Sequence, residues 1–214
     1  MSSIFTLSAS DLASLLCSKV CHDIISPVGA INNGLELLEE GGADEAAMDL
    51  IKTSARNASA RLQFARIAFG AAGSAGVQID TGDAQAVATE YMRGEKAEFT
   101  WNGDRAYLPK NKVKLLLNLI LIANGSIPRG GTLDVGVEAR DDATEVVVRA
   151  AGTKIAFDAQ IGEALAGKLD PAELTGRTAP AHLLSLIAAQ CGGMIQTHAE
   201  SGTLLLGATL PDTM

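Results

Sequence analysis

The chain has 214 residues, of which 47% are hydrophobic and only 4% aromatic, and its formal net charge is −8 at pH 7. This length and composition predict a globular protein with room for two small domains and mainly aliphatic cores. The negative charge argues against nucleic acid or an anionic membrane as a partner, because both are themselves negatively charged. The sequence has neither a bilayer-length apolar run nor a secretion signal, so we expect a cytoplasmic protein.

The first predicted element is a long helix over residues 10–40. Its apolar residues recur at steps of three, four or seven and form one stripe: Leu16, Val20, Ile24, Pro27, Ile31 and Leu38. Ser8 and Asp11 have the spacing of a capping box, which places the start of the helix. The glycines at 41 and 42 are expected to end it.

His22 lies on another face of this helix, with polar and small residues at the same spacing: Ser18, Ser26, Gly29, Asn33 and Glu36. An outward imidazole followed directly by the carboxylate of Asp23 is what a phosphorylatable histidine requires, because the carboxylate fixes the tautomer that attacks. Pro27 cannot donate to the carbonyl of Asp23, so we expect a bend one turn after the histidine. The alternative is an ordinary surface histidine, and we assign no role to His182 or His198.

Three cysteines occur in the chain, and two of them adjoin the histidine. An odd number of cysteines in a chain without a secretion signal argues against a framework of disulfide bonds. Cys17 and Cys21 stand one helical turn apart beside His22, but the pattern supplies no fourth ligand for a metal. We therefore predict no metal site, and two small, partly buried thiols at these positions.

A second helix is predicted over residues 44–69, where apolar residues alternate at steps of three and four: Met48, Ile51, Ala55, Ala58, Leu62, Ala65 and Phe69. With a turn at 41–43, the two helices form an antiparallel hairpin. A lone hairpin leaves much of both stripes in water, so we expect two copies to close a dimeric four-helix bundle. The homodimer would carry two outward His22 side chains.

Residues 70–76 are small and without periodicity, which indicates a linker between domains at 1–72 and 77–214. Beyond it, strands and helices alternate. Strands are predicted at 77–80, 97–101, 132–139, 144–150, 194–197 and 203–210, and helices at 83–92, 112–124 and 181–191. This order predicts a mixed-sheet α/β sandwich with helices on one face, after the α-helical hairpin.

These motifs together resemble the core of sensor histidine kinases, in which a dimerisation and phosphotransfer hairpin precedes a Bergerat-type ATP-binding domain. His22-Asp23 with Pro27 matches the phosphoacceptor motif, and Asn118 in its apolar helix matches the first half of the asparagine motif. The closing strands of the family match the segments at 192–195, 200–203 and 210–211. The resemblance spans nearly the whole chain and implies the same order of domains.

The nucleotide-binding residues of that family are absent where the resemblance places them. The magnesium-binding asparagine falls on Ile122, which offers no oxygen ligand. The adenine-binding aspartate falls on Ala150, two residues before Gly152. Two glycines of the phosphate-binding lid fall on Thr178 and Pro180, and proline has no N–H for a phosphate. We therefore expect neither ATP nor any other cofactor in this chain.

A phosphotransfer hairpin on an inactive ATPase domain is similar to the ChpT-type histidine phosphotransferases of alphaproteobacterial cell-cycle control. This resemblance implies that His22 takes phosphate from the receiver domain of a hybrid kinase and passes it to response regulators, with Mg²⁺ on the receiver only. It also implies that Asp23 orients the imidazole. We expect the receiver to dock on Ser18, Ser26 and Asn33, which share the helical spacing of His22, and on Arg61, which counting from the turn places level with His22 on the second helix.

Two other functions fit the same residues. One is a non-catalytic dimeric adaptor that binds receiver domains, and the other is a divergent but active histidine kinase. Phosphorylation of the histidine by a phosphorylated receiver separates His–Asp phosphotransfer from the adaptor. Nucleotide binding separates the active histidine kinase from a phosphotransferase that has no ATP-dependent kinase activity.

Overall fold

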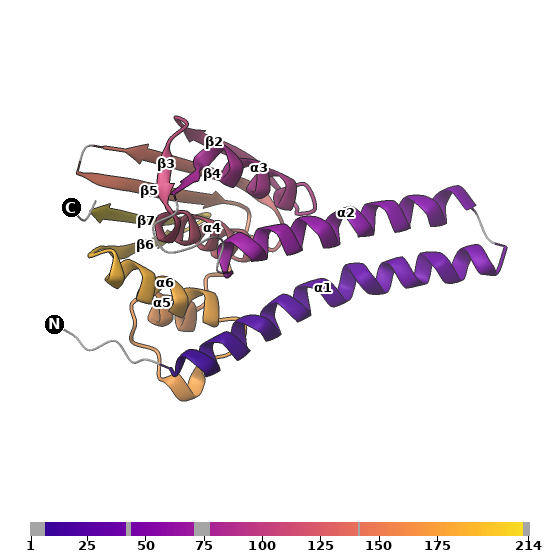
Figure 1. Ribbon diagram of the computed structural model, residues 1–214, viewed down its shortest axis with the longest axis horizontal. Helices are drawn as coiled ribbons and strands as arrows, with labels where there is room; N and C mark the ends of the chain where they lie inside the picture. Colours follow the sequence, from indigo (N-terminus) through magenta and orange to yellow (C-terminus); the bar gives the residue numbers. More distant parts are fainter. Residues whose placement is uncertain (1–6, 42–43, 71–77, 141, 212–214) are drawn as a thin grey trace.

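The structure is a computed structural model that describes residues 7–41, 44–70, 78–140 and 142–211. Two long antiparallel helices, α1 (Ala9–Glu39) and α2 (Asp44–Ala68), project from an α/β domain (Figure 1). The predicted order of a helical hairpin followed by an α/β domain is confirmed. None of the described helices combines the length and apolarity needed to cross a membrane.

Helix α1 begins at the predicted cap. Ser8 has an extended backbone, and its hydroxyl oxygen accepts from the Asp11 N–H at 3.2 Å. The helix continues through Pro27, and Gly41 just beyond its end has a φ of 70°, which favours glycine. All six residues of the predicted apolar stripe are partly buried, so this face turns towards the rest of the molecule. The second predicted terminating glycine, at 42, lies outside the described residues.

The two helices approach closely at Gly34. A Cβ atom there would lie 2.6 Å from Cγ1 of Ile51 and 3.2 Å from the carbonyl oxygen of Ala47. The predicted stripe of α2 divides between two neighbouring faces. Ala58 is buried within the single chain, whereas Met48 and Leu62 are exposed. Part of the predicted stripe is therefore already packed inside the hairpin, and the dimeric four-helix bundle stays a prediction.

The α/β domain contains a five-stranded mixed sheet in the order β2-β4-β5-β7-β6. Its strands are β2 (Ala97–Gly103), β4 (Gly131–Ala139), β5 (Ala143–Ala151), β6 (Met194–Glu200) and β7 (Thr203–Pro211). Strand β2 runs parallel to β4, and the other pairs are antiparallel, which confirms a mixed sheet. The predicted strand at 77–80 is not part of this sheet. It forms β1 (Gln78–Asp80) and pairs with β3 (Tyr107–Pro109) in a separate two-stranded sheet.

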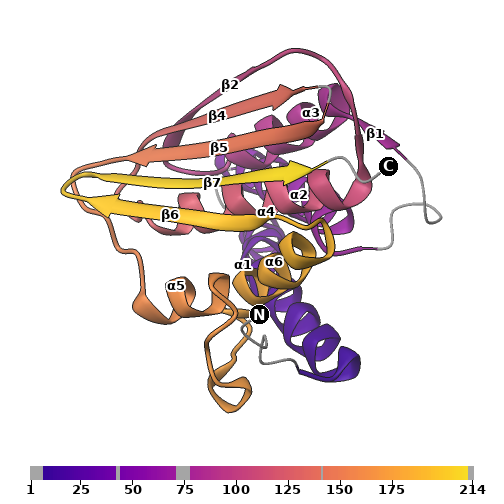
Figure 2. The ribbon, with the colours of Figure 1, turned by 90° about the vertical axis from the view of Figure 1, so that its left-hand side faces the viewer.

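Helices cover one face of the five-stranded sheet (Figure 2). They are α3 (Thr81–Met92), α4 (Lys110–Gly125), α5 (Ala159–Leu165) and α6 (Ala179–Gln190), with a short 3₁₀ helix at Pro171–Glu173. The centre of this layer is α4, whose leucine-rich segment is fully buried: Leu115, Leu116, Leu117, Leu119 and Ile120. The opposite face of the sheet is open and carries a shallow trough of about 810 Å³.

One hydrophobic core joins the base of the hairpin to the α/β domain. Phe64 and Ala68 of α2 belong to the same buried cluster as the leucines of α4. The rings of Phe64 and Tyr91 pack with centroids 4.4 Å apart, and the Asn118 amide donates to the carbonyl of Ala68 at 3.0 Å. The predicted linker lies, apart from Gly70, outside the described residues, and the hairpin and the α/β domain on either side of it share one core, which fixes the direction in which the hairpin leaves the domain.

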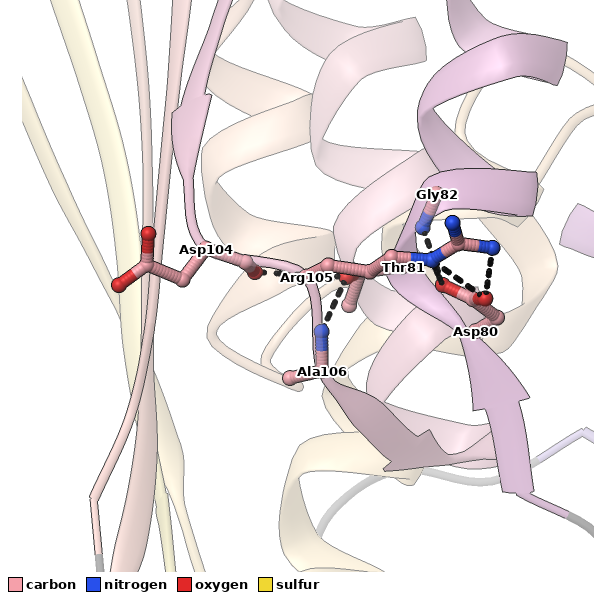
Figure 3. A network of polar contacts seen from close by, with 6 residues as sticks. All are labelled: Asp80, Thr81, Gly82, Asp104, Arg105 and Ala106. Carbon is pink, nitrogen blue, oxygen red and sulfur yellow. Dashed lines mark hydrogen bonds and ion pairs between the residues drawn. The ribbon is translucent and has the colours of Figure 1, made fainter.

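A polar network fastens the start of α3 to the loop after β2 (Figure 3). The Arg105 guanidinium grips both carboxylate oxygens of Asp80, with its Nε at 3.0 and 2.7 Å from them. Asp80 also caps α3 by accepting from the Gly82 N–H at 2.8 Å. The backbone of Thr81 donates to the Ala106 carbonyl at 2.8 Å, and Ala106 N–H donates to the Thr81 hydroxyl at 2.9 Å. Hydrogen bonding to Arg105 holds the pKa of Asp80 below its ordinary value.

His182 on α6 is a buried histidine whose side chain is only 1% exposed. Neither of its ring nitrogens has a hydrogen-bond partner among the described residues. Burial lowers the pKa of this imidazole, because the charged form loses its hydration. The ring is therefore held in its neutral form in the folded protein.

We expect this histidine to make folding sensitive to acid. As the pH falls below about 6.5, the unfolded imidazole binds a proton that the buried ring resists, so the free energy of unfolding decreases. His182→Met keeps a similar side-chain volume without a titrating group. Between pH 7 and pH 5, the free energy of unfolding of this variant should therefore fall by about 1 kcal/mol less than that of wild type. Urea denaturation at a series of pH values measures the difference. If the free energy of unfolding depends on pH in the same way in both proteins, His182 is not the cause of the acid sensitivity.

Candidate phosphotransfer site

His22 occupies an accessible position on α1, and its side chain is 88% exposed. The predicted outward position of this residue agrees with the structure. Oδ1 of the adjacent Asp23 lies 3.6 Å from Nδ1 of His22. A carboxylate on the Nδ1 side favours a proton on that nitrogen, which leaves Nε2 with its lone pair. The pair is therefore arranged for nucleophilic attack by Nε2.

The second oxygen of Asp23 is engaged by Lys19, one helical turn earlier. The Lys19 ammonium forms a close ion pair with Oδ2 of Asp23, and both side chains are largely buried. The carboxylate of Asp23 therefore stands between an ammonium and an imidazole. Sequence reasoning did not single out Lys19, although its spacing of four residues from Asp23 is a regular helical pair.

An open cleft of about 320 Å³ lies between α1 and α2 beside His22. It brings together four of the predicted site residues from two helices, namely His22, Asp23, Ser26 and Arg61. Pro27 of the predicted phosphoacceptor motif also lines it, together with three residues that were not predicted: Ala30, Ser54 and Asn57. Their contribution depends on the pairing of the helices, which a periodicity alone does not give.

Ser18 and Asn33, the other two predicted docking residues, are both exposed on α1. Neither lines the cleft beside His22. Ser18 lies one turn before the histidine, and Asn33 lies three turns after it, about 16 Å along the helix axis. Their assignment to a docking surface stays a prediction.

Arg61 is held at the edge of the cleft by the α/β domain. Its Nη2 forms an ion pair with Oε1 of Glu95 at 2.6 Å, and its guanidinium lies 5.5 Å from the centre of the Tyr91 ring. Oε2 of Glu95 accepts from the Asn124 amide at 3.0 Å. Burial raises the pKa of the Tyr91 hydroxyl, so it stays protonated. Arg61 therefore has a fixed position, and it also lines the cleft beside His22.

The asparagine motif of α4 serves the packing of this protein. Asn118 is fully buried, and its amide donates to the carbonyls of Ala68 and Lys114 at 3.0 and 2.8 Å. Ile122, where the resemblance places a magnesium ligand, is buried on the same helix. The arrangement ties α4 to the end of α2 and provides no oxygen for a hard metal at Ile122.

The other positions of the nucleotide motifs are equally structural. Ala150 is fully buried in β5, and the Gly152 N–H donates to the carbonyl of Gly202 at 3.0 Å. Thr178 precedes α6 and accepts from the Thr175 N–H at 2.9 Å, and Pro180 lies in the first turn of that helix. The residues present therefore do not fit a magnesium-bound nucleotide, because metal ligand, adenine acceptor and lid donor are replaced by packing groups.

Both cysteines beside the histidine are exposed, so the prediction that they are partly buried is wrong for Cys17 and Cys21. Only Cys191 is partly buried. The first two lie on a face of α1 that the single chain leaves uncovered, next to Ile25. Within the described part of the chain, no three or more His, Cys, Asp or Glu side chains gather as a metal site would need.

Comparison with known proteins places this site in context. Residues 81–203 match the family model described as the histidine phosphotransferase C-terminal domain. Protein phosphotransferase ChpT of Brucella abortus (strain 2308) is 59% identical over 208 residues, which cover 97% of this chain and 100% of that protein. The solved structure of a bacterial phosphotransferase is 57% identical, with a TM-score of 0.88, and covers 97% of this chain and 100% of that one.

A more distant structural match is full-length ShkA in complex with AMPPNP. The TM-score is 0.50 at 19% sequence identity, over 97% of this chain and 47% of ShkA. This similarity shows a shared fold alone. The similarities at higher identity extend over both the hairpin and the α/β domain, since they cover nearly all of the chain.

Proposed function

The chain belongs to the histidine phosphotransferase family and acts in two-component phosphorelays, and we propose that it carries the phosphoryl group on His22. The observation that supports this assignment best is the exposed imidazole of His22, with the Asp23 carboxylate beside Nδ1, at the edge of a cleft. We propose that the donor is the receiver domain of a hybrid histidine kinase. The acceptors are then receiver domains of response regulators.

In the proposed reaction, the lone pair of Nε2 attacks the phosphorus of an aspartyl phosphate on the docked receiver. A P–N bond forms, and the P–O bond to the receiver aspartate breaks with its electron pair returning to that carboxylate. Nδ1 keeps its proton, so the phosphorylated ring carries a positive charge that Asp23 stabilises. The same steps in reverse deliver the group to the next receiver. Such in-line transfers depend mainly on positioning and charge neutralisation.

The proposed docking surface is centred on the cleft beside His22. A receiver that holds Mg²⁺ presents carboxylates around its phosphorylated aspartate, because hard cations take oxygen ligands. Arg61 gives the edge of the cleft a positive charge, while its ion pair with Glu95 keeps it in place. Ser26 lies in the same cleft, and the exposed Ser18 and Asn33 extend the surface along α1. No metal of this chain's own is needed in the proposed reaction.

A homodimer is the second part of the proposal. Exposed apolar side chains follow one face of α1, at Ile25, Val28 and Leu35, and continue on α2 at Met48 and Leu62. Spacings of three and seven residues on α1, and of fourteen residues on α2, keep these side chains in line along each helix. Isolated apolar residues are common on surfaces, but an aligned set on two adjacent helices matches the seam of a four-helix bundle. A second copy of the hairpin would cover it.

We expect the protein to take phosphate from a receiver and not from ATP. Incubation with magnesium and radiolabelled ATP should leave it unlabelled, since Ile122, Ala150 and Pro180 replace the nucleotide contacts. Incubation with a receiver domain that carries a labelled phosphoryl group should transfer the label to this protein. The label should be lost in acid and kept in base, as phosphohistidine requires. Gel autoradiography with and without acid treatment measures both results.

The same experiment separates the two alternatives. A non-catalytic adaptor would bind the phospho-receiver and acquire no label. A divergent kinase would acquire label from ATP without any receiver, and calorimetry would then report binding of the nucleotide. Either outcome would contradict the proposed function.

A further inference from the structure

Three side chains of α1 form a continuous line of contacts that ends at the proposed phosphoacceptor. The ammonium of Lys19 pairs with Oδ2 of Asp23, and Oδ1 of the same carboxylate lies 3.6 Å from Nδ1 of His22. We propose that Lys19 is a positioning residue for phosphotransfer, because by holding one oxygen of Asp23 it aims the other at the imidazole. This inference rests on the proposed role of His22.

The helix by itself does not bring Asp23 and His22 together. Adjacent residues of a helix point about 100° apart, and they are not among the neighbour pairs that meet on its surface. Lys19 and Asp23, in contrast, are four residues apart and lie on one face. A carboxylate that is tethered on one side by the ammonium has a restricted χ2 torsion. Its free oxygen then keeps one direction, towards His22.

The order of this pair shows that something besides the helix maintains it. An acid followed by a lysine four residues later is the favourable order in an isolated helix, and here the order is reversed. An exposed pair of this kind contributes little to stability. Lys19 and Asp23 are instead largely buried. A second part of the protein therefore confines them.

That second part is the segment between α5 and α6, which stands where the resemblance places the nucleotide lid. Gly176 in this segment lies against α1. A Cβ atom on it would be 3.4 Å from the carbonyl oxygen of Leu15 and 3.5 Å from the backbone nitrogen of Lys19. Figure 1 shows the chain between α5 and α6 passing beside the first half of α1. The lid segment thus packs on the turn that carries Lys19.

Charges around Lys19 direct its ammonium towards Asp23. Lys19 lines a cavity of about 230 Å³ at the junction of the hairpin and the α/β domain. Arg61 and Arg177 line the same cavity, and each already has an acidic partner, Glu95 at 2.6 Å and Asp158 at 3.1 Å. Both of these carboxylates are therefore engaged by an arginine, whereas the Asp23 carboxylate is the one that the Lys19 ammonium contacts. The α/β domain therefore acts on His22 through Lys19 and Asp23.

The test compares Lys19→Met with Lys19→Arg and with a control, Lys52→Met, which removes an exposed lysine from α2. Two quantities are measured, the single-turnover rate of transfer from a phospho-receiver and the tautomer of His22 from its ring ¹⁵N shifts in the unphosphorylated protein. Direct acid–base groups contribute about 10²–10⁴-fold to rates. A residue that acts through one such group should contribute less, so we expect Lys19→Met to slow transfer about tenfold. It should also increase the Nε2–H tautomer.

Lys19→Arg keeps a cation four residues from Asp23 and should restore most of the rate and of the Nδ1–H tautomer. Lys52→Met should leave both quantities as in wild type. In an Asp23→Ala background, Lys19→Met should have no further effect on the rate, because its action passes through the carboxylate. This double-mutant cycle separates positioning from a direct contact with the receiver.

Two results would overturn the inference. One is a Lys19→Met protein with a wild-type tautomer and a rate within twofold of wild type, which would leave Lys19 a surface helix pair. The other is an equal loss of rate in the Asp23→Ala background, which would place Lys19 on the receiver. The tautomer of His22 is measured without any phosphate transfer, so it tests the role of Lys19 alone. If the protein does not carry phosphate on His22, the wild type itself will acquire no label on that residue. The two failures are therefore distinguishable.

Discussion

His22→Ala should abolish acceptance of phosphate while the protein still binds the receiver. The imidazole is the proposed nucleophile, so no P–N bond can form without it, and transfer should fall by at least about 10³-fold. The substitution removes only one exposed side chain from the docking surface, so the dissociation constant for the receiver should change by less than about tenfold. Label transfer from a phospho-receiver measures the first quantity, and calorimetry with the unphosphorylated receiver measures the second.

The matched control is His198→Ala. His198 is another exposed histidine, on β6 of the α/β domain, and its only ion-pair partner in the described residues is Glu200 at 3.8 Å. This variant should accept phosphate at the wild-type rate. If His22→Ala still acquires acid-labile label, or if His198→Ala loses it, another residue is the phosphoacceptor.

The hairpin was predictable because its pattern is long and local. The stripe of α1 and the outward position of His22 follow from the 3.6-residue period over 31 residues, and the cap at Ser8 is a contact within one turn. The long apolar helix α4 was predictable for the same reason. Two short elements were not predicted, α5 with seven residues and β3 with three, because so few residues give no clear period.

Contacts between distant parts of the chain account for what the sequence did not predict at the site. Arg61 was placed level with His22 by counting from the turn, but its fixed position depends on Glu95, which is 34 residues away. Lys19 gained a role only when the segment at Gly176 was seen against α1. Spacing shows which side chains share a face of one helix, and it does not show what packs on that face.

The same limit applies to the apolar stripe of α2. Steps of three and four residues mark Met48, Ala58 and Leu62 as one stripe, yet the single chain buries Ala58 and exposes the other two. A face that packs within the hairpin and a face that packs against another copy are both apolar. A sequence does not distinguish them, whereas the exposure of each side chain in one chain does.

The exposed face of the hairpin leads to the last prediction. A variant with both Ile25→Glu and Leu62→Glu should convert the protein from a dimer to a monomer. These side chains are 70% and 50% exposed in the single chain, so glutamate at either position stays hydrated in a folded monomer. In a four-helix bundle the same carboxylates would be buried without partners, at a cost of about 3–5 kcal/mol each. Two copies carry four such groups, which exceeds what a hairpin interface can offset.

Light scattering after gel filtration measures the mass, with wild type expected at twice the 22.1 kDa of one chain. The variant should have the mass of one chain and an unchanged far-UV circular dichroism spectrum, because its internal core is untouched. Met194→Glu is the control, since Met194 is 75% exposed on β6, away from the hairpin, and its variant should stay dimeric. Ala58→Glu would be a poor test, because Ala58 is buried within the chain and its charge would unfold the hairpin itself. A double variant that still has the dimer mass would show that the copies meet at another surface, and a monomeric wild type would remove the need for one.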